Sequence, residues 1–379
     1  MIRPSQERPT WAEINLSSLG FNFRSVKKFV GAHIKYMAVV KADAYGHGAV
    51  ECARTLEAAS VDCFGVALPE EAVQLRKNGI KNPIVCLGGF WNGQENLLIE
   101  NNLAPVIYRL EMAELLNRAA KVKGIVAEIH VKVDTGMGRI GVRFDEINQF
   151  AERLKKYKNL NLRGLMTHFA AADDLSQNEF TILQIERFYK AVEIFESKGF
   201  RPVYKDLANS PGAIAHEKSR GNMVRLGGVL YGLGGDVIPA GVEKPELRAV
   251  LSLQTRIAFL KNVPKGETLG YSRTFKTERD SIIATIPIGY HDGYTRALSN
   301  RSRVIVNKKY AAVVGRISMD WTIVDVTEIP NVKVNDEVIL IGKQNNLQVS
   351  AEDLARLTDT ISYEITCGIS NRVRRIFRH

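Results

Sequence analysis

The stretch YMAVVKADAYGHGAV (residues 36–50) determines how the N-terminal part of the chain is interpreted. Its apolar run, residues 37–40, has the composition of a buried strand, yet it ends in Lys41 and leads into a Gly-His-Gly turn. A run that is apolar at every position is typical of a strand covered on both faces. The stretch therefore predicts the first strand of a parallel sheet, with a lysine at its carboxyl end.

Similar runs recur outward from this strand, separated by segments with apolar residues at helical spacing. Eight strand–helix repeats over about 200 residues are the number expected of a (β/α)8 barrel. A doubly wound sheet has a similar rhythm, but no GxGxxG follows the first strand, which favours the barrel. The seven further runs are CFGVAL, PIVCLG, APVIY, AEIHVKV, LRGLMTHF, VYKDLAN and MVRLGGVLYG.

The pattern changes after Lys244, where apolar and polar residues alternate with period two and only SAEDLARLTD is clearly helical. The fold class is therefore α/β: an N-terminal (β/α)8 TIM-type barrel over residues 1–245, followed by a mainly β C-terminal domain over residues 246–379. The segment VEKPE is the expected linker.

Bulk composition excludes some classes of protein. The net charge of +11 over 379 residues suggests a nucleic-acid partner, but only the C-terminal NRVRRIFRH is densely basic, so none is expected. No apolar run reaches membrane-spanning length, and the first residues lack an apolar signal region, so a cytoplasmic protein is expected. The four cysteines are widely spaced, which predicts free thiols and no metal site.

The strand ends carry the candidate chemistry, because a barrel's active site lies at the carboxyl ends of its strands. A lysine such as Lys41 usually just reaches out to water. Held at the barrel mouth, however, it can lose its charge and attack a carbonyl. The loops after strands seven and eight offer Ser210, Gly227 and Gly228, which suit a phosphate. A Schiff-base lysine beside a phosphate cradle is what pyridoxal 5′-phosphate requires.

Seven motifs, in order along nearly the whole chain, resemble the alanine racemase family of fold-type III pyridoxal-phosphate enzymes. They are VVKADAYGHG, VDTGMGRIG, THFA, VRLGGVLYG, LGYSRTF, GRISMD and ISYEITC. The resemblance implies a homodimer that interconverts L- and D-alanine by a two-base proton transfer at Cα and supplies D-alanine for peptidoglycan. It also implies pyridoxal 5′-phosphate as the cofactor.

The same resemblance assigns the catalytic residues. Lys41 holds the cofactor and is one base, and Tyr271, contributed by the second subunit, is the other. His168 assists the tyrosine. Arg225 faces the pyridine nitrogen, where it cannot accept a proton.

The other implied site residues fall into four groups. Cofactor contacts are expected from Lys41, Tyr45, Arg139, His168, Ser210, Arg225, Gly227, Gly228 and Tyr363. Substrate contacts are expected from Arg139, Met319 and Tyr271. The substrate channel is expected to include Tyr290, Arg316 and Asp173. Lys132 resembles a lysine that is carbamylated in some members.

Four alternatives stay open at this point. A broader racemase acting on serine, lysine or arginine is the nearest one. A fold-type III decarboxylase would be expected to be longer and to carry an acidic residue in place of Arg225. A non-catalytic pyridoxal-phosphate carrier would lack the β domain and Tyr271. The fourth alternative, a nucleic-acid-binding protein, is supported by the net positive charge alone.

Overall fold

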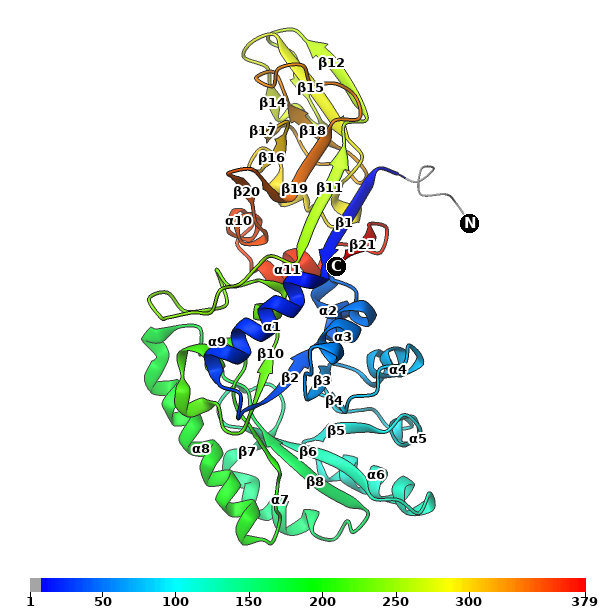
Figure 1. The fold of residues 1–379 in the computed structure, drawn as a ribbon, viewed down its shortest axis with the longest axis vertical. Helices are drawn as coiled ribbons and strands as arrows, with labels where there is room; N and C mark the ends of the chain where they lie inside the picture. Colours follow the sequence, from blue (N-terminus) through cyan, green and yellow to red (C-terminus); the bar gives the residue numbers. More distant parts are fainter. Residues whose placement is uncertain (1–7) are drawn as a thin grey trace. The chain divides into compact units, whose positions relative to one another are not determined.

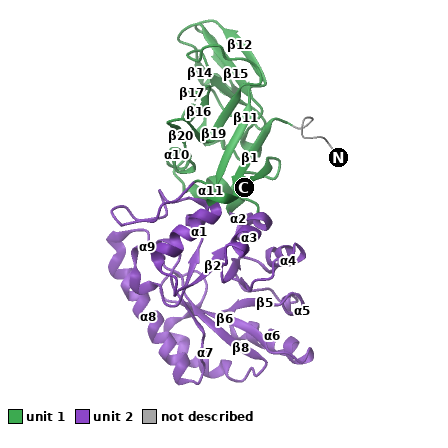
Figure 2. Cartoon of the chain, viewed as in Figure 1, with its two compact units in different colours: residues 1–18, 45–48, 249–379 green, residues 19–44, 49–248 purple. Residues whose placement is uncertain are grey.

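A computed structural model describes residues 8–379 (Figure 1). Residues 1–7 lie outside the described part. The expectation that no export signal is present rests partly on these residues. The chain forms two compact units (Figure 2). Residues 19–44 and 49–248 make the barrel unit, and residues 8–18, 45–48 and 249–379 make the β unit.

Eight parallel strands close into a ring in the barrel unit, which confirms the predicted (β/α)8 barrel. Their order is β5-β4-β3-β2-β10-β9-β8-β6, and β6 pairs with β5 to close the ring. Each predicted apolar run overlaps one of these strands. The two-residue β7 (Val142–Arg143) adds to β6 outside the ring. The eight strands are β2 (Lys35–Val39), β3 (Cys63–Val66), β4 (Ile84–Cys86), β5 (Leu103–Ile107), β6 (Ala127–Asp134), β8 (Leu160–Met166), β9 (Tyr204–Asp206) and β10 (Met223–Leu226).

Helices alternate with these strands. In α6, for example, Met112, Leu116 and Ala120 are buried at four-residue spacing, so one stripe of the helix is covered. The helix α4 begins at Pro69. A backbone N–H in the first turn of a helix has no partner within the helix, so proline, which has no N–H, costs nothing at this position. The helices are α1 (Leu16–Val30), α2 (Lys41–Gly46), α3 (Ala49–Ala58), α4 (Pro69–Lys77), α5 (Glu95–Glu100), α6 (Leu110–Val122), α7 (Ile147–Leu154), α8 (Asn178–Ser197) and α9 (Ser210–Ala215).

Strand alternation explains how the barrel interior leads up to the site. Met37, Met166 and Met223 belong to one buried core cluster. Side chains two residues apart on a strand point to the same side. Lys41 lies four residues after Met37, and His168 and Arg225 lie two residues after Met166 and Met223. These even spacings place the three residues on the same side as the methionines, nearer the carboxyl ends of the strands. The fold thus brings three of the predicted site residues to the same end of the barrel.

One large, mainly antiparallel sheet dominates the β unit, as predicted. Its order is β12-β15-β18-β17-β16-β19-β11-β1-β21, with β20 paired to β19. A separate two-stranded sheet contains β13 (Thr268–Leu269) and β14 (Phe275–Lys276). The strands of the large sheet are β1 (Thr10–Asn15), β11 (Leu251–Arg256), β12 (Phe259–Val263), β15 (Ser281–Ile286), β16 (Arg303–Val306), β17 (Lys309–Val313), β18 (Thr322–Asp325), β19 (Glu337–Gln344), β20 (Leu347–Val349) and β21 (Arg374–Arg378).

Two features of this unit differ from the sequence-based division. Strand β1 pairs with β11 and β21, so residues 10–15 belong to the β sheet and not to the barrel. The boundary near residue 245 itself stays a prediction. Besides the expected α10 (Ala351–Leu357), a short α11 (Ser362–Cys367) is present. A six-residue helix carries too little periodicity to be recognised.

Three further observations hold for residues 8–379. No helix in this range is long and apolar enough to cross a membrane. No group of His, Cys, Asp and Glu there could hold a metal ion. All four cysteines are free thiols, of which Cys52, Cys63 and Cys86 are buried.

Candidate active site

Arg225 is the centre of the polar group inside the barrel. Its side chain is only 5% exposed and pairs with the fully buried carboxylate of Asp206. Its Nη2 also donates to the carbonyl of Thr167 at 2.8 Å and lies 3.3 Å from Nδ1 of His168. A guanidinium held by several partners has one orientation, so it can present a fixed charge to a bound group.

His168 is neutral in this environment. Burial, and then the positive charge of Arg225, lower the pKa of His168 to about 2. Because a guanidinium can only donate, Nδ1 of His168 accepts from Arg225 and the ring proton is on Nε2. The histidine can therefore donate a hydrogen bond from Nε2 without adding a charge.

Asp206 was missed by the sequence interpretation. Burial raises the pKa of this carboxyl to about 6, although Arg225 opposes the rise, and Oδ2 has no hydrogen-bond partner among residues 8–379. The signal available in the sequence was a single Asp within the predicted strand VYKDLAN. Because a buried carboxylate is rarely unpaired, this Asp could have indicated a buried positively charged partner.

Lys132 also lies among these charges. Burial, followed by the nearby Arg225 and Arg139, lowers the pKa of Lys132 to about 7. The neutral amine, which is the form that reacts with carbon dioxide, is therefore more accessible for Lys132 than for an ordinary surface lysine.

We expect a carbamate on Lys132 that forms as the pH rises through about 7. The amine is protonated and unreactive below this pKa, and neutral above it. Carbon-13 NMR with labelled bicarbonate should show a protein carbamate signal that grows from about pH 6 to about pH 8. The signal should be absent in Lys132→Ala. A wild-type signal equal to that of the variant would contradict the expectation.

A buried hydrogen-bond network holds the loops after β6 and β8. The hydroxyls of Thr135 and Thr167 lie 2.8 Å apart. Gln184, fully buried on α8, donates to Thr135 Oγ1 at 3.0 Å and to the carbonyl of His168 at 3.1 Å. A polar residue on the apolar stripe of α8 was the only sequence signal for this role.

Ser210 begins α9 and is 3% exposed. Its Oγ accepts from the amide of Gly227 at 2.9 Å, which leaves the hydroxyl proton available for donation. Gly228 follows at the start of the 3-10 turn η5 (Gly228–Tyr231). The predicted phosphate residues Ser210, Gly227 and Gly228 are therefore adjacent.

Lys41 is followed by an unusual turn. Ala42, Asp43, Ala44 and Tyr45 all have φ between 51° and 55°, so α2 winds in the left-handed region. Such a conformation costs non-glycine residues roughly 1–2 kcal/mol each. Within the barrel unit, Glu71 accepts from the amide of Ala42 at 2.7 Å and so helps to fix the turn. Strain held in place beside a candidate nucleophile is typical of a functional site.

These side chains suit pyridoxal 5′-phosphate. Arg225, Lys132, Arg139 and Lys41 all lie close enough to lower the pKa of His168. Cationic groups such as Arg225 and Arg139 around one neutral histidine fit a ligand with several negative charges. Arg139 and Asp173 are exposed on the loops that follow β6 and β8.

The remaining predicted residues belong to the β unit. Tyr271, 66% exposed, opens the 3-10 turn η6 (Tyr271–Arg273). A Cβ on the preceding Gly270 would lie 3.0 Å from the amide nitrogen of Arg316, so the loops of Tyr271 and Arg316 touch. In the same unit, the rings of Tyr45 and Tyr363 meet edge to face at 5.2 Å.

Tyr290 and Met319 are also joined within the β unit. The amide of Tyr290 donates to the carbonyl of Ser318 at 3.0 Å, and that of His291 donates to the carbonyl of Met319 at 3.1 Å. A Cβ on Gly289 would lie 2.4 Å from the Met319 carbonyl oxygen, so only glycine permits this approach. The side chains of Tyr290 and Met319 remain 42% and 51% exposed.

Comparison with known proteins decides the family. The family model "Alanine racemase, N-terminal domain" matches residues 14–234, and "Alanine racemase, C-terminal domain" matches residues 250–377. The chain belongs to the alanine racemase family. An alanine racemase of Halothermothrix orenii is similar to this chain, with 45% identity over 374 residues that cover 98% of this chain and 97% of the relative.

Solved structures of alanine racemases have the same fold. The enzyme of Clostridium difficile 630 is 39% identical, with a TM-score of 0.92 over 98% of this chain and 96% of that one. The alanine racemase of Bartonella henselae, described as having covalently bound pyridoxal phosphate, is 30% identical with a TM-score of 0.86 over 98% and 99%. The recognition made from seven motifs is thus confirmed, as is the fold.

Proposed function

We propose that this chain interconverts L-alanine and D-alanine with pyridoxal 5′-phosphate as its cofactor, as its alanine racemase relatives suggest. The observation that carries the proposal is the convergence of Lys41, His168 and Arg225 at one end of the barrel of this family. When bound, the cofactor supplies a carbonyl for an amine to attack and a ring that withdraws electrons from Cα.

The residues of this chain have separate tasks in the proposal. Lys41 binds the cofactor covalently and moves a proton on one face of Cα. Tyr271 moves a proton on the opposite face, as inversion at Cα requires. His168, which is neutral, assists Tyr271 by donating a hydrogen bond from Nε2. Phosphate contacts come from Tyr45, Ser210, Gly227, Gly228 and Tyr363.

Substrate recognition uses the loops of both units. Arg139 contacts the ring hydroxyl and steers the substrate, and the backbone N–H of Met319 binds its carboxylate. The channel residues Tyr290, Arg316 and Asp173 restrict access. Two tyrosines, Tyr290 and Tyr363, would leave room for little more than a methyl side chain.

The protein is proposed to act as a homodimer. Tyr271, Tyr290 and Met319 are between 42% and 66% exposed in the single chain, although they are proposed to face a substrate. A second copy would cover them, so that each site combines one protomer's barrel with the other's β unit.

We further propose a cytoplasmic enzyme that supplies D-alanine for peptidoglycan. The free thiols, three of them buried, suit a reducing compartment.

The direct test is incubation of the purified protein with single L-amino acids in deuterated water. We expect L-alanine to become racemic with deuterium at Cα, and serine, lysine and arginine to react far more slowly. Serine or lysine racemised as fast as alanine would establish the broader racemase instead. An absence of Cα exchange with every amino acid would refute the enzyme proposal.

Arg225 predicts a limit on side reactions. Because a guanidinium cannot accept a proton, Arg225 facing the pyridine nitrogen would make the bound ring a weaker electron sink than a carboxylate would. Arg225→Glu should raise the pyruvate formed by transamination per racemisation event. Since Asp206 would then face a second buried carboxylate, the same change should also be made with Asp206→Asn.

The control for this prediction is Arg225→Lys, which retains the positive charge. It should keep pyruvate formation near the wild-type ratio. No rise in pyruvate in either glutamate variant would count against the proposed role.

A further inference from the structure

The C-terminal run, residues 371–379, is densely basic. In the structure its arginines are engaged within the β unit. Arg375 donates to the carbonyls of Ser370 and Val373 at 2.6 and 2.8 Å. Arg378 reaches Glu13 at 3.3 Å. The run is therefore part of the sheet, and its charge is directed at groups of this chain.

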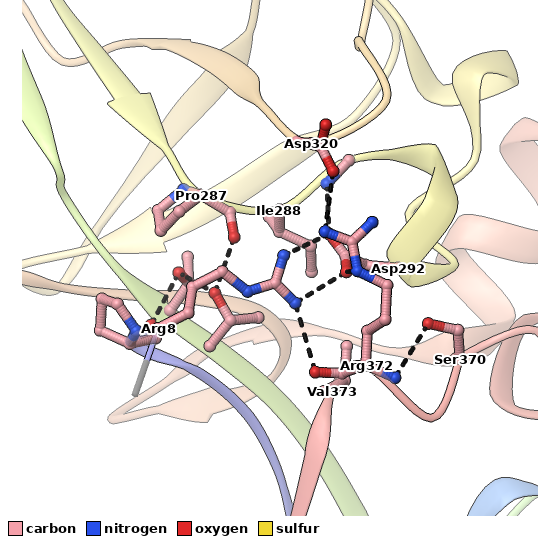
Figure 3. Close-up of polar contacts among 12 residues, drawn as sticks. Arg8, Pro287, Ile288, Asp292, Asp320, Ser370, Arg372 and Val373 are labelled. Carbon is pink, nitrogen blue, oxygen red and sulfur yellow. Dashed lines mark hydrogen bonds and ion pairs between the residues drawn. The ribbon is translucent and has the colours of Figure 1, made fainter. Parts of the chain in front are cut away.

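Arg372 belongs to a network of four charges (Figure 3). At its centre is Asp292, whose side chain is fully buried. Arg8 donates to both carboxylate oxygens of Asp292, at 2.9 and 2.7 Å, and Gly289 donates its amide to Oδ2 at 3.0 Å. A buried carboxylate with this many partners is firmly fixed.

Arg372 extends this network to a second loop. Its Nε lies 3.6 Å from Asp292 Oδ1, and its Nη2 donates to Asp320 Oδ1 at 2.8 Å. Asp292 is two residues after Tyr290, and Asp320 is next to Met319. One guanidinium thus bridges the two loops that carry Tyr290 and Met319.

The bridge reinforces a pairing of the two loops by backbone hydrogen bonds, from Tyr290 to Ser318 and from His291 to Met319. The amide of Met319 lies between the Ser318 and Met319 carbonyls of this pairing, and Met319 directly precedes Asp320, whose carboxylate Arg372 holds. A shift of Asp320 would be transmitted directly to that amide, since the two residues are adjacent.

We propose that Arg372 is a positioning residue that fixes the backbone N–H of Met319 for recognition of the substrate carboxylate. The inference rests on the proposed function, in which this N–H contacts the substrate. Arg372 acts through Asp320 and Asp292 and touches no substrate itself.

The test uses Arg372→Gln and Asp320→Asn in the full-length holoenzyme. Both should raise the KM for alanine in each direction by roughly three- to tenfold and leave kcat within about twofold, since a misplaced binding group weakens ground and transition states alike. The double variant should be no worse than the stronger single one, because both remove the same contact. Arg372→Gln should fold, since Asp292 keeps both bonds from Arg8.

Hydrogen exchange provides a second readout that does not depend on turnover. Peptides that contain residues 318–321 should exchange faster in both variants than in wild type. The matched control is Arg378→Gln, which removes another arginine of the same run. It should leave both KM and exchange unchanged.

Two results would overturn the proposal. One is a lower melting temperature for Arg372→Gln with KM unchanged, which would mean that the arginine only supports the fold. The other is exchange in residues 318–321 equal to wild type in both variants. If wild type does not racemise alanine, the proposed function fails by itself, and the exchange measurement still decides whether Arg372 positions the loop.

Discussion

The Lys41→Ala variant is expected to lose racemisation by at least about 10³-fold, because it removes both the covalent anchor and one of the two bases. Lys41 follows β2 at the end of the barrel that also presents His168 and Arg225. Alanine racemisation at saturating cofactor measures the loss. Borohydride reduction of wild type, followed by peptide mapping, should place the cofactor on Lys41.

The matched control is Lys35→Ala, at the opposite end of the same strand. Lys35 is 56% exposed and pairs with Asp62 at 2.7 Å on the surface. This variant should retain near-normal turnover and labelling. Cofactor attached to another lysine of the wild type would contradict the assignment.

The second large effect concerns the other base. Tyr271→Phe should slow racemisation about 10²- to 10⁴-fold in both directions, since the phenol oxygen that moves the proton is gone while the ring remains. The 66% exposed side chain makes few contacts within its own chain, so folding should be unaffected. Turnover from each enantiomer and the cofactor absorbance spectrum together measure the effect.

Tyr310→Phe is the control for this change. Tyr310 lies in the same unit, and its hydroxyl donates to the carbonyl of Gln348 at 3.0 Å, away from the candidate site. It should show wild-type kinetics. Near-normal turnover by Tyr271→Phe in both directions would mean that a different group is the second base.

The barrel could be predicted from the sequence because its strands are apolar on both faces. Each run, such as AEIHVKV, is distinct from the helical segments around it, and the position of Lys41 follows directly from that pattern. The proximity of Ser210 and Gly227 could be predicted for the same reason, since they follow consecutive strands, while their contact with a phosphate stays a prediction.

Other features depend on tertiary contacts that no local pattern encodes. Strand β1 pairs with β11, about 240 residues later in the chain, and nothing in TWAEIN specifies that partner. Gln184 and Asp206 act through buried hydrogen bonds, which are visible only once the barrel is closed. The contacts of the basic C-terminal end could not be predicted, because its acceptors, such as Asp320, lie far away in sequence.

The central claim is that one site combines Lys41 of one protomer with Tyr271 of the other. Subunit mixing tests it most directly, by unfolding Lys41→Ala and Tyr271→Phe together and refolding them as a 1:1 mixture. Each variant refolded alone should be inactive. Statistical mixing places heterodimers in half of the population, each with one intact site of two, so the mixture should recover about a quarter of wild-type activity. No recovery, with heterodimers demonstrated by mass spectrometry, would show that both residues act within one chain or that the pair is wrongly assigned.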